Sequence, residues 1–538
     1  MKNWKRIVAL GTGLAMLFLT ACGTTNQEAG GSDDGASSTS ASEGGTLIIG
    51  MDSDLQTLDP GNGYEVYGNM MYYALYDNLF RVYKDSTPVP SLVEDYELDE
   101  AQTTYTFKLR EDVTFSSGNP LTSADVEFSI NRTKNLKSNT SHHTTGIVSI
   151  ETPDDYTVVI TLDKPDASFL AKLANNSFSI LDAEVVRENG GTDAEDAATT
   201  DTAQAWLDQN SAGSGAYVLE SWTQNVEVVL NKNPEYWGEV KNDRVICKEI
   251  PDVNTQIQML LGGDIDIALG VGVDNAVQLE GQEGVDLFYA QGNTITFLMM
   301  NQDPEIGGPM SNPLVQEAVR AAINYEELLQ LSGENAVLPL NIAPEGFTGA
   351  LQKDAATSMD IERAKELLAE AGYPDGFDVP FTVATFSTEG MPWTTLGQKI
   401  KDDLSKVGIN AEIATGEVGV VIDSYREGKE QFLLMHWHPD YPDINNQLAF
   451  LPGNTVGLRA NWTDTSNEEL EAAKQIVMTE ADETIRAEAS ETVQKLLAEN
   501  MPYAFLVQHP KVIGYSTNIE GIHYYEVQKI NFQEIAIK

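Results

Sequence analysis

The chain has very few cysteines for a protein of its length. Only Cys22 and Cys247 occur among 538 residues, so a framework of several disulfides is excluded. Hydrophobic residues make up 41% of the sequence, and stability therefore has to come from a large apolar core. Cys247 lies in a strand-like apolar run at 245–247, where we expect a buried and unreactive thiol.

Positive charge is also scarce. Lysine and arginine number 33 against 82 aspartates and glutamates, which gives a formal net charge of −49. A surface of this sign repels nucleic acid and anionic lipid headgroups, so we expect neither as a partner. With so many acidic residues, carboxylate pairs arise by chance, and a pair of acids is no evidence of catalysis.

The sequence lacks the motifs of the common hydrolases and nucleotide-binding enzymes. It contains no HExxH helix for zinc, no GxSxG nucleophile turn and no GxxxxGK[ST] phosphate loop. A glycosidase that works through two carboxylates has no diagnostic motif, but nothing in the sequence favours one. We therefore predict a protein that is not an enzyme.

The apolar run at the start of the chain is too short to cross a bilayer as a helix. It extends from Ile7 to Ala21, about 15 residues, whereas a transmembrane helix needs roughly 20. Lys2, Lys5 and Arg6 precede this run. A basic start followed by a short apolar run and small residues is typical of a secretory signal, here at 1–21.

The signal ends in Leu19-Thr20-Ala21-Cys22, which resembles the lipobox of bacterial lipoproteins. The resemblance implies cleavage before Cys22 and a diacylglycerol on its sulfur, which would anchor the protein to a membrane. Residues 22–45 are rich in Gly, Ser, Thr and Ala, a composition that favours a flexible tether. The implied location is extracytoplasmic: the outer face of the cell membrane in a single-membrane bacterium, or the periplasm where two membranes exist.

Beyond the tether about 490 residues remain, too many for one hydrophobic core, so we expect two or three lobes. Alternating apolar residues predict strands, and apolar residues at helical spacing predict helices. The predicted strands are 46–51, 104–109, 157–162, 226–230 and 265–269. The predicted helices are 70–80, 313–331, 360–371, 393–407 and two within 468–500. Interleaved strands and helices indicate an α/β chain with mixed sheets.

A specific resemblance begins at residues 109–126, which read LREDVTFSSGNPLTSADV. This segment resembles the signature of the bacterial extracytoplasmic solute-binding proteins of the peptide/nickel class, family 5. Similar blocks follow in the family's order at 213–217, 233–238, 263–266, 364–374 and 436–443. The blocks span nearly the whole mature chain, so the resemblance covers the full length and not one motif.

The resemblance implies a bilobal periplasmic-binding-protein-like fold with an extra small domain, mixed sheets and hinge strands. Lobe I would contain residues 45–88, 213–300 and 503–538, the small domain residues 89–212, and lobe II residues 301–502. In this family the lobes close on a solute and present it to an ABC importer, a permease pair with its ATPases. The chain would act as a monomer that captures a small solute, most simply a short peptide, without a cofactor. An oligosaccharide or a metal chelate in the same cleft, or a sensing lipoprotein, remain alternatives.

The segment 432–441 carries the most specific chemistry. Residues 432–435 predict a buried strand, and Pro439 ends it just before Asp440. A cationic amine in a dry cleft needs a carboxylate partner, since an unpaired buried charge is costly. In peptide-binding members of the family an aspartate that matches Asp440 holds the amine of the peptide. Trp437, His438 and Tyr441 come from the same block, and Trp437 offers a flat apolar wall.

Further candidates come from elsewhere in the chain. In relatives the stretch after Asp59-Pro60 lines the ligand groove, which makes Tyr64, Glu65 and Tyr67 candidates here. The apolar strand before Asp440 contains no arginine, so Arg426 and Arg459 are the candidates for binding a carboxylate of the solute.

The histidines allow a metal-binding interpretation, which we do not favour. His436 and His438 share a face of the predicted strand, a spacing that can supply two metal ligands with Asp440 or Asp443 as a third. Nickel-binding members of the family, however, place their histidine in a different motif, so we expect no metal site. His142 and His143 lie in a polar loop, and we expect both to be solvated.

Overall fold

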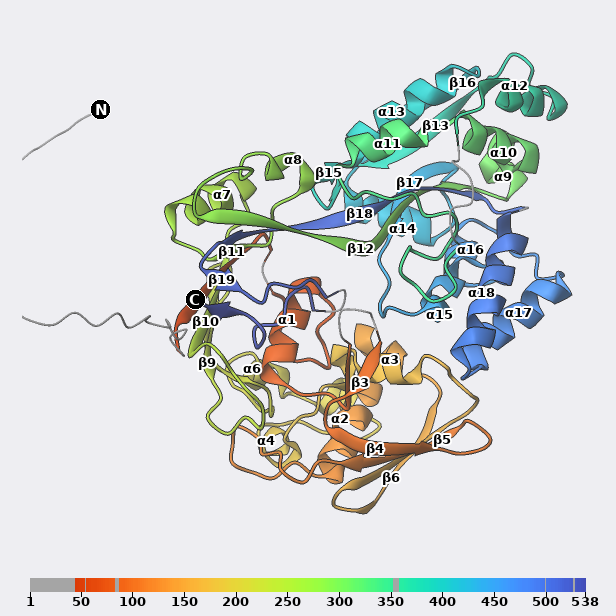
Figure 1. The fold of residues 1–538 in the computed structure, drawn as a ribbon. Coiled ribbons are helices and arrows are strands. Elements are labelled where there is room, and N and C mark those ends of the chain that lie inside the picture. Colours follow the sequence, from red (N-terminus) through yellow and green to blue (C-terminus); the bar gives the residue numbers. More distant parts are fainter. Residues whose placement is uncertain (1–43, 54, 83–86, 352–357, 499, 526–527) are drawn as a thin grey trace, which may run out of the picture. The chain divides into compact units, whose positions relative to one another are not determined.

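Two long antiparallel strands, β12 (Val285–Met300) and β18 (Tyr503–Ser516), lie side by side at the centre of the fold (Figure 1). The computed structural model describes residues 44–53, 55–82, 87–351, 358–498, 500–525 and 528–538. Within these residues the two strands belong to a mixed sheet of ten strands. Its order is β16 (Ile409–Gly416), β13 (Phe377–Ala384), β17 (Phe432–Trp437), β12, β18, β11 (Ile267–Ala268), β1 (Thr46–Met51), β10 (Arg244–Glu249), β9 (Glu227–Lys232) and β8 (Tyr217–Thr223).

The two ends of this strand pair are buried in different hydrophobic cores. Ile295–Met300 of β12 and Tyr503–Val507 of β18 lie in one large apolar cluster. Val285 and Val512, at the other ends, lie in a second cluster. The register of the pair shifts between the two regions, which marks a β-bulge where the strands bend. β12 and β18 are therefore strands that cross from one core to the other, as expected for a bilobal fold.

A third apolar cluster contains residues from the N-terminal, middle and C-terminal parts of the described chain. Apolar residues of β1, β8, β9 and β10 pack there with helix α1 (Val66–Leu75), and residues near the C-terminus complete the cluster. The other elements of this region are α4 (Ala183–Glu188), α5 (Ala197–Thr200), α6 (Gln204–Leu207), α7 (Val253–Gly262), α8 (Val273–Ala276) and the strand pair β19 (Ile519–Glu520) with β20 (Ala536–Ile537).

A separate antiparallel sheet has its own core. Its order is β4 (Val93–Leu98), β5 (Thr104–Leu109), β7 (Thr157–Leu162) and β6 (Ile147–Asp154). Helix α2 (Ser123–Leu136) packs on it and begins with a capping box between Thr122 and Asp125. The remaining elements are β2 (Phe80–Val82), β3 (Pro88–Pro90), η1 (Asn139–Thr144), α3 (Phe169–Leu173) and η2 (Asn176–Phe178).

Helices surround the other half of the large sheet, drawn in green, cyan and blue in Figure 1. They are α9 (Pro304–Gly307), η3 (Gly308–Ser311), α10 (Pro313–Ala322), α11 (Tyr325–Leu331), α12 (Ile361–Glu370), α13 (Trp393–Ser405), α14 (Val418–Arg426), α15 (Ile444–Gln447), η4 (Leu448–Phe450), α16 (Thr455–Arg459), α17 (Glu468–Thr479) and α18 (Glu483–Ala498). A short hairpin joins β14 (Ser387–Thr388) to β15 (Met391–Pro392).

Several predicted elements differ from the observed ones. The helix predicted over 313–331 is two helices, because Ile323 is extended and the Asn324 side chain caps a new helix at the Glu327 amide. The helix predicted over 70–80 ends at Leu75, where Tyr76 becomes extended, and Phe80 belongs to a strand. The strand predicted over 265–269 shortens to β11.

Two predictions concern the cysteines. Cys247 on β10 is fully buried, and burial raises the pKa of its thiol, as expected for an unreactive side chain. Cys22, the signal at 1–21 and most of the tether lie outside the described residues. No helix in the described part of the chain is long and apolar enough to span a bilayer.

The apolar clusters bear on the expected domain boundaries. One cluster contains residues from 295–507 and one contains residues from 73–180. The other two contain residues from 47–76, Phe128, residues from 181–285 and residues from 512 onward. We keep the division into lobe I, a small domain and lobe II as an interpretation of these clusters.

Candidate functional site

A cavity of about 590 Å³ collects side chains from three distant parts of the chain. This volume falls within the range of roughly 300–1,000 Å³ that is common for small-molecule sites. Its lining residues are Tyr64, Glu65 and Asn69, then His142, Asn175 and Asn176, and finally Arg426, His436, Trp437, His438, Pro439, Asp440, Asn446, Ala449, Thr455 and Arg459.

Asp440 follows β17 and is held by groups from all three parts. The Tyr64 hydroxyl donates a 2.7 Å hydrogen bond to its Oδ1. The Asn175 side chain donates to its backbone carbonyl at 3.2 Å, and the Asn446 side chain donates to Oδ2 at 3.4 Å. His142 Nε2 lies 3.8 Å from Oδ2. The carboxylate therefore has a fixed orientation at the cavity wall.

The environment keeps the Asp440 carboxyl ionised. Partial burial alone would raise its pKa, but the neighbouring His142 and the hydrogen bond from Tyr64 outweigh this effect and lower the pKa to about 2. The same contact with Asp440 raises the pKa of His142. The side chain of Asp440 is still 28% exposed, so the carboxylate is open to a further cationic group.

The loop before α1 brings Tyr64 to the cavity. Gly63 and Asn62 close a turn on the Asp59 carbonyl, and the Asn176 side chain donates to the Gly63 carbonyl at 3.1 Å. Asp59 itself is buried and paired with Arg132 through two hydrogen bonds of 2.7 and 2.8 Å. Helix α2 therefore fixes the position of the Tyr64 loop.

His143 corrects one of our expectations from the sequence. It lies on η1 and is 4% exposed, so the prediction that both histidines of the pair are solvated is wrong. Its Nδ1 lies 3.0 Å from the Ser177 hydroxyl, and burial lowers its pKa to about 3. His142 is half-exposed. A polar sequence around a residue does not predict exposure when the segment packs against neighbouring elements, here α2 and η2.

The cavity lining also contains an indole and two guanidinium groups. Trp437 packs edge-on against Phe450 at 5.6 Å, and its buried Nε1 has no hydrogen-bond partner within the described residues. Arg459 stacks over Tyr425 at 5.0 Å, and no acidic group of the described chain lies within 4 Å of its guanidinium. Arg426 faces Asp423 at 3.7 Å and is mostly exposed.

Three other candidates have different surroundings. Glu65 lines the cavity, accepts hydrogen bonds from the Gln56 and Tyr64 amides, and has a pKa raised by burial. Tyr67 and Tyr441 do not line it. Tyr67 is buried with its hydroxyl on Asp52, and Tyr441 is buried beneath Lys172.

His436 and His438 both line the cavity, but their ring nitrogens have different partners. Nδ1 of His436 lies 3.1 Å from the Thr388 hydroxyl, and Nδ1 of His438 lies 3.0 Å from that of Thr294. Burial lowers the pKa of His436 to about 4 and that of His438 to about 3. Within the described residues the two do not belong to a group of three potential metal ligands.

Sequence reasoning missed the polar residues that surround Asp440. Asn175 and Asn176 lie at the start of η2, and Asn446 belongs to α15. No local signal could have identified them, because each is an ordinary cap or turn residue by spacing. Among the residues around Asp440, only the adjacent histidines His142 and His143 stood out in the sequence.

Comparison with known families decides the class of the protein. The family of bacterial extracellular solute-binding proteins, family 5 Middle, matches residues 87–457, more than half of the chain. The chain belongs to this family.

Relatives in the solute-binding family match along most of this chain. The probable D,D-dipeptide-binding periplasmic protein DdpA of Escherichia coli K12 is 26% identical, with 88% of this chain and 90% of the relative covered. The dipeptide-binding protein DppE of Bacillus subtilis is 25% identical, with 97% of both chains covered. The solved structure of the periplasmic binding protein DppA from Helicobacter pylori, in complex with the peptide STSA, has a TM-score of 0.74 and 24% identity, covering 92% of this chain and 98% of that one.

Membership of the solute-binding family confirms several predictions. The fold is that of the large periplasmic binding proteins, with mixed sheets. The protein is a transport binding protein of an ABC importer and not an enzyme. Members of this family work outside the cytoplasm.

Proposed function

We propose that this solute-binding protein captures a short peptide in the cavity around Asp440, with the N-terminal amine of the peptide bound to that carboxylate. The observation that carries the proposal is an ionised and partly exposed aspartate, oriented by Tyr64, on the wall of a cavity of about 590 Å³. An enclosed ammonium group needs such a partner. The names of the two relatives compared above, both dipeptide-binding proteins, support the same solute class.

The other end of the peptide would meet Arg459. Its guanidinium lines the cavity without an acidic partner in the described residues, and a guanidinium binds a carboxylate in bidentate fashion. Trp437 adds an indole N–H that has no partner among the described residues and is suited to a peptide carbonyl. Asp440 and Arg459 have opposite charge, which matches the zwitterionic form of a short peptide.

Closure of the lobes would enclose the solute. Tyr64 and Asp440 come from different apolar cores that β12 and β18 connect, so a ligand between them contacts both. Such a ligand favours the closed form because only that form provides both sets of contacts. We further propose that the protein acts as a monomer and presents its closed form to the permease pair.

Calorimetry on the purified protein tests the solute assignment. Screening di- and tripeptides identifies a binder, and the same peptide with an acetylated amine is then titrated. We expect acetylation of the peptide, or the substitution Asp440→Asn in the protein, to weaken binding by about 2–5 kcal/mol, because either removes one partner of a buried charge pair.

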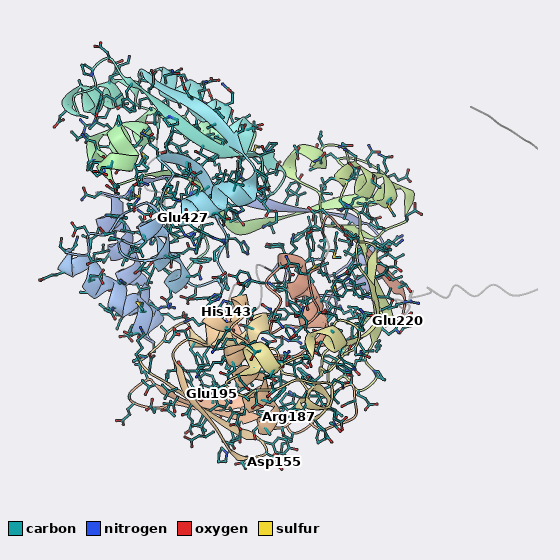
Figure 2. The ribbon with its side chains drawn as sticks, turned by 180° about the vertical axis from the view of Figure 1, so that it is seen from behind. His143, Asp155, Arg187, Glu195, Glu220 and Glu427 are labelled. Atoms are coloured by element: carbon teal, nitrogen blue, oxygen red, sulfur yellow. The ribbon has the colours of Figure 1, made fainter. Side chains whose placement is uncertain are left out.

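A matched control is Glu427→Gln, which makes the same acid-to-amide change at an exposed residue of the same half of the protein (Figure 2). Glu427 does not line the cavity, and its substitution should leave the affinity unchanged. Equal binding of acetylated and free peptides, or full affinity in Asp440→Asn, would overturn the role of Asp440. Tight binding of a neutral oligosaccharide but of no peptide would overturn the peptide assignment.

We also propose that the mature protein is anchored to the membrane through a lipid on Cys22. The lipobox-like Leu19-Thr20-Ala21-Cys22 supports this proposal. Expression of Cys22→Ser should shift the protein from the membrane fraction to the soluble extracytoplasmic fraction and abolish labelling with a radioactive fatty acid. Unchanged labelling of the Cys22→Ser variant would contradict the anchor.

A further inference from the structure

His142, His143 and Asp440 form a cluster of potential metal ligands, of which His142 and Asp440 line the cavity. One ring nitrogen of each histidine and one carboxylate oxygen all lie within 4.8 Å of one another. The histidines come from η1 of the small domain and the aspartate from the loop after β17. Figure 2 shows His143 on the side of its domain that faces the blue C-terminal part of the chain.

The hydrogen bonds of His143 leave Nε2 free to bind a metal. The Ser177 hydroxyl donates to the Asn175 side chain at 3.0 Å, so it accepts a hydrogen bond from Nδ1–H of His143. With the proton on Nδ1, Nε2 carries a lone pair. This nitrogen is buried and has no hydrogen-bond partner in the described part of the chain. A buried lone pair without a partner is costly unless a ligand completes it.

His142 is oriented in the same way. Its Nδ1 lies 2.5 Å from the Asn139 carbonyl oxygen, which can only accept, so Nδ1 carries the proton. The Nε2 atom is therefore left to face Asp440 Oδ2, 3.8 Å away. Metal-binding histidines typically donate their other ring N–H to a carbonyl or another acceptor, which fixes the ring. Both histidines already have this arrangement.

From this geometry we propose that His142, His143 and Asp440 bind a divalent transition-metal ion such as Zn²⁺, through Nε2 of each histidine and Oδ2 of the aspartate. In a tetrahedral zinc site with bonds of about 2.0–2.1 Å, the ligand atoms lie roughly 3.4 Å apart. The separation of 3.8 Å between His142 and Asp440 is close to this value. Two imidazoles and a carboxylate favour Zn²⁺, Ni²⁺ or Cu²⁺ over Ca²⁺ or Mg²⁺.

The charges around the cluster are compatible with a cation. Lys172 is the nearby basic residue, and its charge is balanced by Asp166 at 2.5 Å. Oδ1 of Asp440 keeps its hydrogen bond from Tyr64, so the two carboxylate oxygens have separate tasks. Three protein ligands leave a fourth position for water or for a coordinating group of a solute.

Metal titration of the protein without any peptide tests the inference. The purified protein, dialysed against EDTA and then buffer, is titrated with Zn²⁺ in a calorimeter and with Co²⁺ in an absorption spectrometer. We expect one ion per chain and the visible absorption of a low-coordinate Co²⁺ ion with nitrogen and oxygen ligands. His142→Ala and Asp440→Asn should each weaken Zn²⁺ binding by at least about tenfold, because loss of a direct ligand costs no less than loss of a supporting contact.

His523→Ala is the matched control for His142→Ala, because it makes the same substitution at a histidine outside the cluster. The Zn²⁺ affinity of this variant should equal that of the unmodified protein. His143→Gln adds a third ligand variant if its thermal unfolding shows that the protein is folded. If it is not folded, the variants of the more exposed His142 and Asp440 test the site by themselves. No Zn²⁺ binding, or binding that survives His142→Ala and Asp440→Asn, overturns the site. Peptide binding by metal-free protein that binds no Zn²⁺ overturns only this inference, whereas Zn²⁺ binding without affinity for any peptide overturns only the proposed function.

Discussion

The Tyr64 hydroxyl donates a 2.7 Å hydrogen bond to the carboxylate of Asp440, although the two residues lie 376 positions apart in the sequence. Tyr64 precedes α1, which packs in the same apolar cluster as β1, β8, β9 and β10. Asp440 follows β17, which packs in the large cluster that contains Ile295–Met300. The contact therefore links the two lobes directly at the cavity. It also connects the position of the lobes to the charge of the group that we propose to bind the solute.

Substitution Tyr64→Phe should raise the pKa of Asp440 from about 2 toward the ordinary value near 3.9, by roughly one unit, because the ionised form loses a donor. A ¹³C NMR titration of labelled aspartate carboxyls measures this shift, with Asp440→Asn to assign the signal. Because the pKa of Asp440 is lower in the folded protein than in the unfolded chain, this carboxylate stabilises the folded state above about pH 4. The contribution disappears as the pH falls through about 2. An unchanged titration in Tyr64→Phe would show that the hydroxyl does not affect the carboxylate.

Substitution Gly63→Ala should displace the Tyr64 loop. A Cβ atom at Gly63 would overlap the hydroxyl of Tyr72, which is fully buried and bonded to the Thr57 carbonyl at 2.9 Å. Overpacking of this kind costs about 1–3 kcal/mol, measured by urea denaturation. Gly262→Ala in α7 is the control, because its Cβ would meet nothing closer than 3.5 Å and alanine favours a helix. Equal stability of the two variants would show that a Cβ atom at position 63 does not overlap the Tyr72 hydroxyl.

Substitution Arg132→Met should destabilise the protein by about 3 kcal/mol or more. The Arg132 guanidinium is fully buried between Asp59 and Asp201, at 2.7 and 2.8 Å, and its loss leaves two carboxylates without their partner. The exposed pair of Arg363 with Glu317 provides the comparison, and Arg363→Met should cost less than about 1 kcal/mol. The midpoints of urea unfolding measure both changes. Similar midpoints for the two variants would show that the buried Arg132 stabilises the protein no more than the exposed Arg363.

The free energy of unfolding should decrease as the pH falls from 7 to 5. Burial lowers the pKa of His143 and of His509 to about 3, and both side chains are less than 5% exposed. In the unfolded chain a histidine takes up a proton near pH 6.5, so each neutral buried histidine costs about 1 kcal/mol per pH unit below that value. His142 has a raised pKa and works in the opposite direction, since its stabilisation is present below pH 6.5.

Urea denaturation at pH 7, 6 and 5 measures this dependence. His509→Gln should reduce the slope, because one proton fewer is taken up on unfolding. A free energy of unfolding that stays constant or increases toward pH 5 would show that the buried histidines do not destabilise the folded protein in this pH range.

Local sequence patterns predicted many elements well. Asp360 caps α12 as expected, its side chain accepting from the Arg363 amide at 2.9 Å, and the two helices within 468–500 separate where predicted. The break between α10 and α11 was missed, because the apolar spacing continues across Ile323 while the backbone turns. Apolar periodicity reports which face is buried, but it does not report whether the helix axis continues.

The sequence alone was sufficient to establish the family, the α/β class and the absence of enzymatic motifs, and to single out Asp440, because these depend on residue types and their spacing along the chain. Only the tertiary structure decided that His142 and His143 lie beside Asp440, and that Tyr67 and Tyr441 are buried away from the cavity. The physical reason is that the cavity wall is formed by loops, helices and a strand from three separate parts of the chain. Which side of each segment faces the cavity depends on how the hydrophobic cores pack, and no local pattern records this packing.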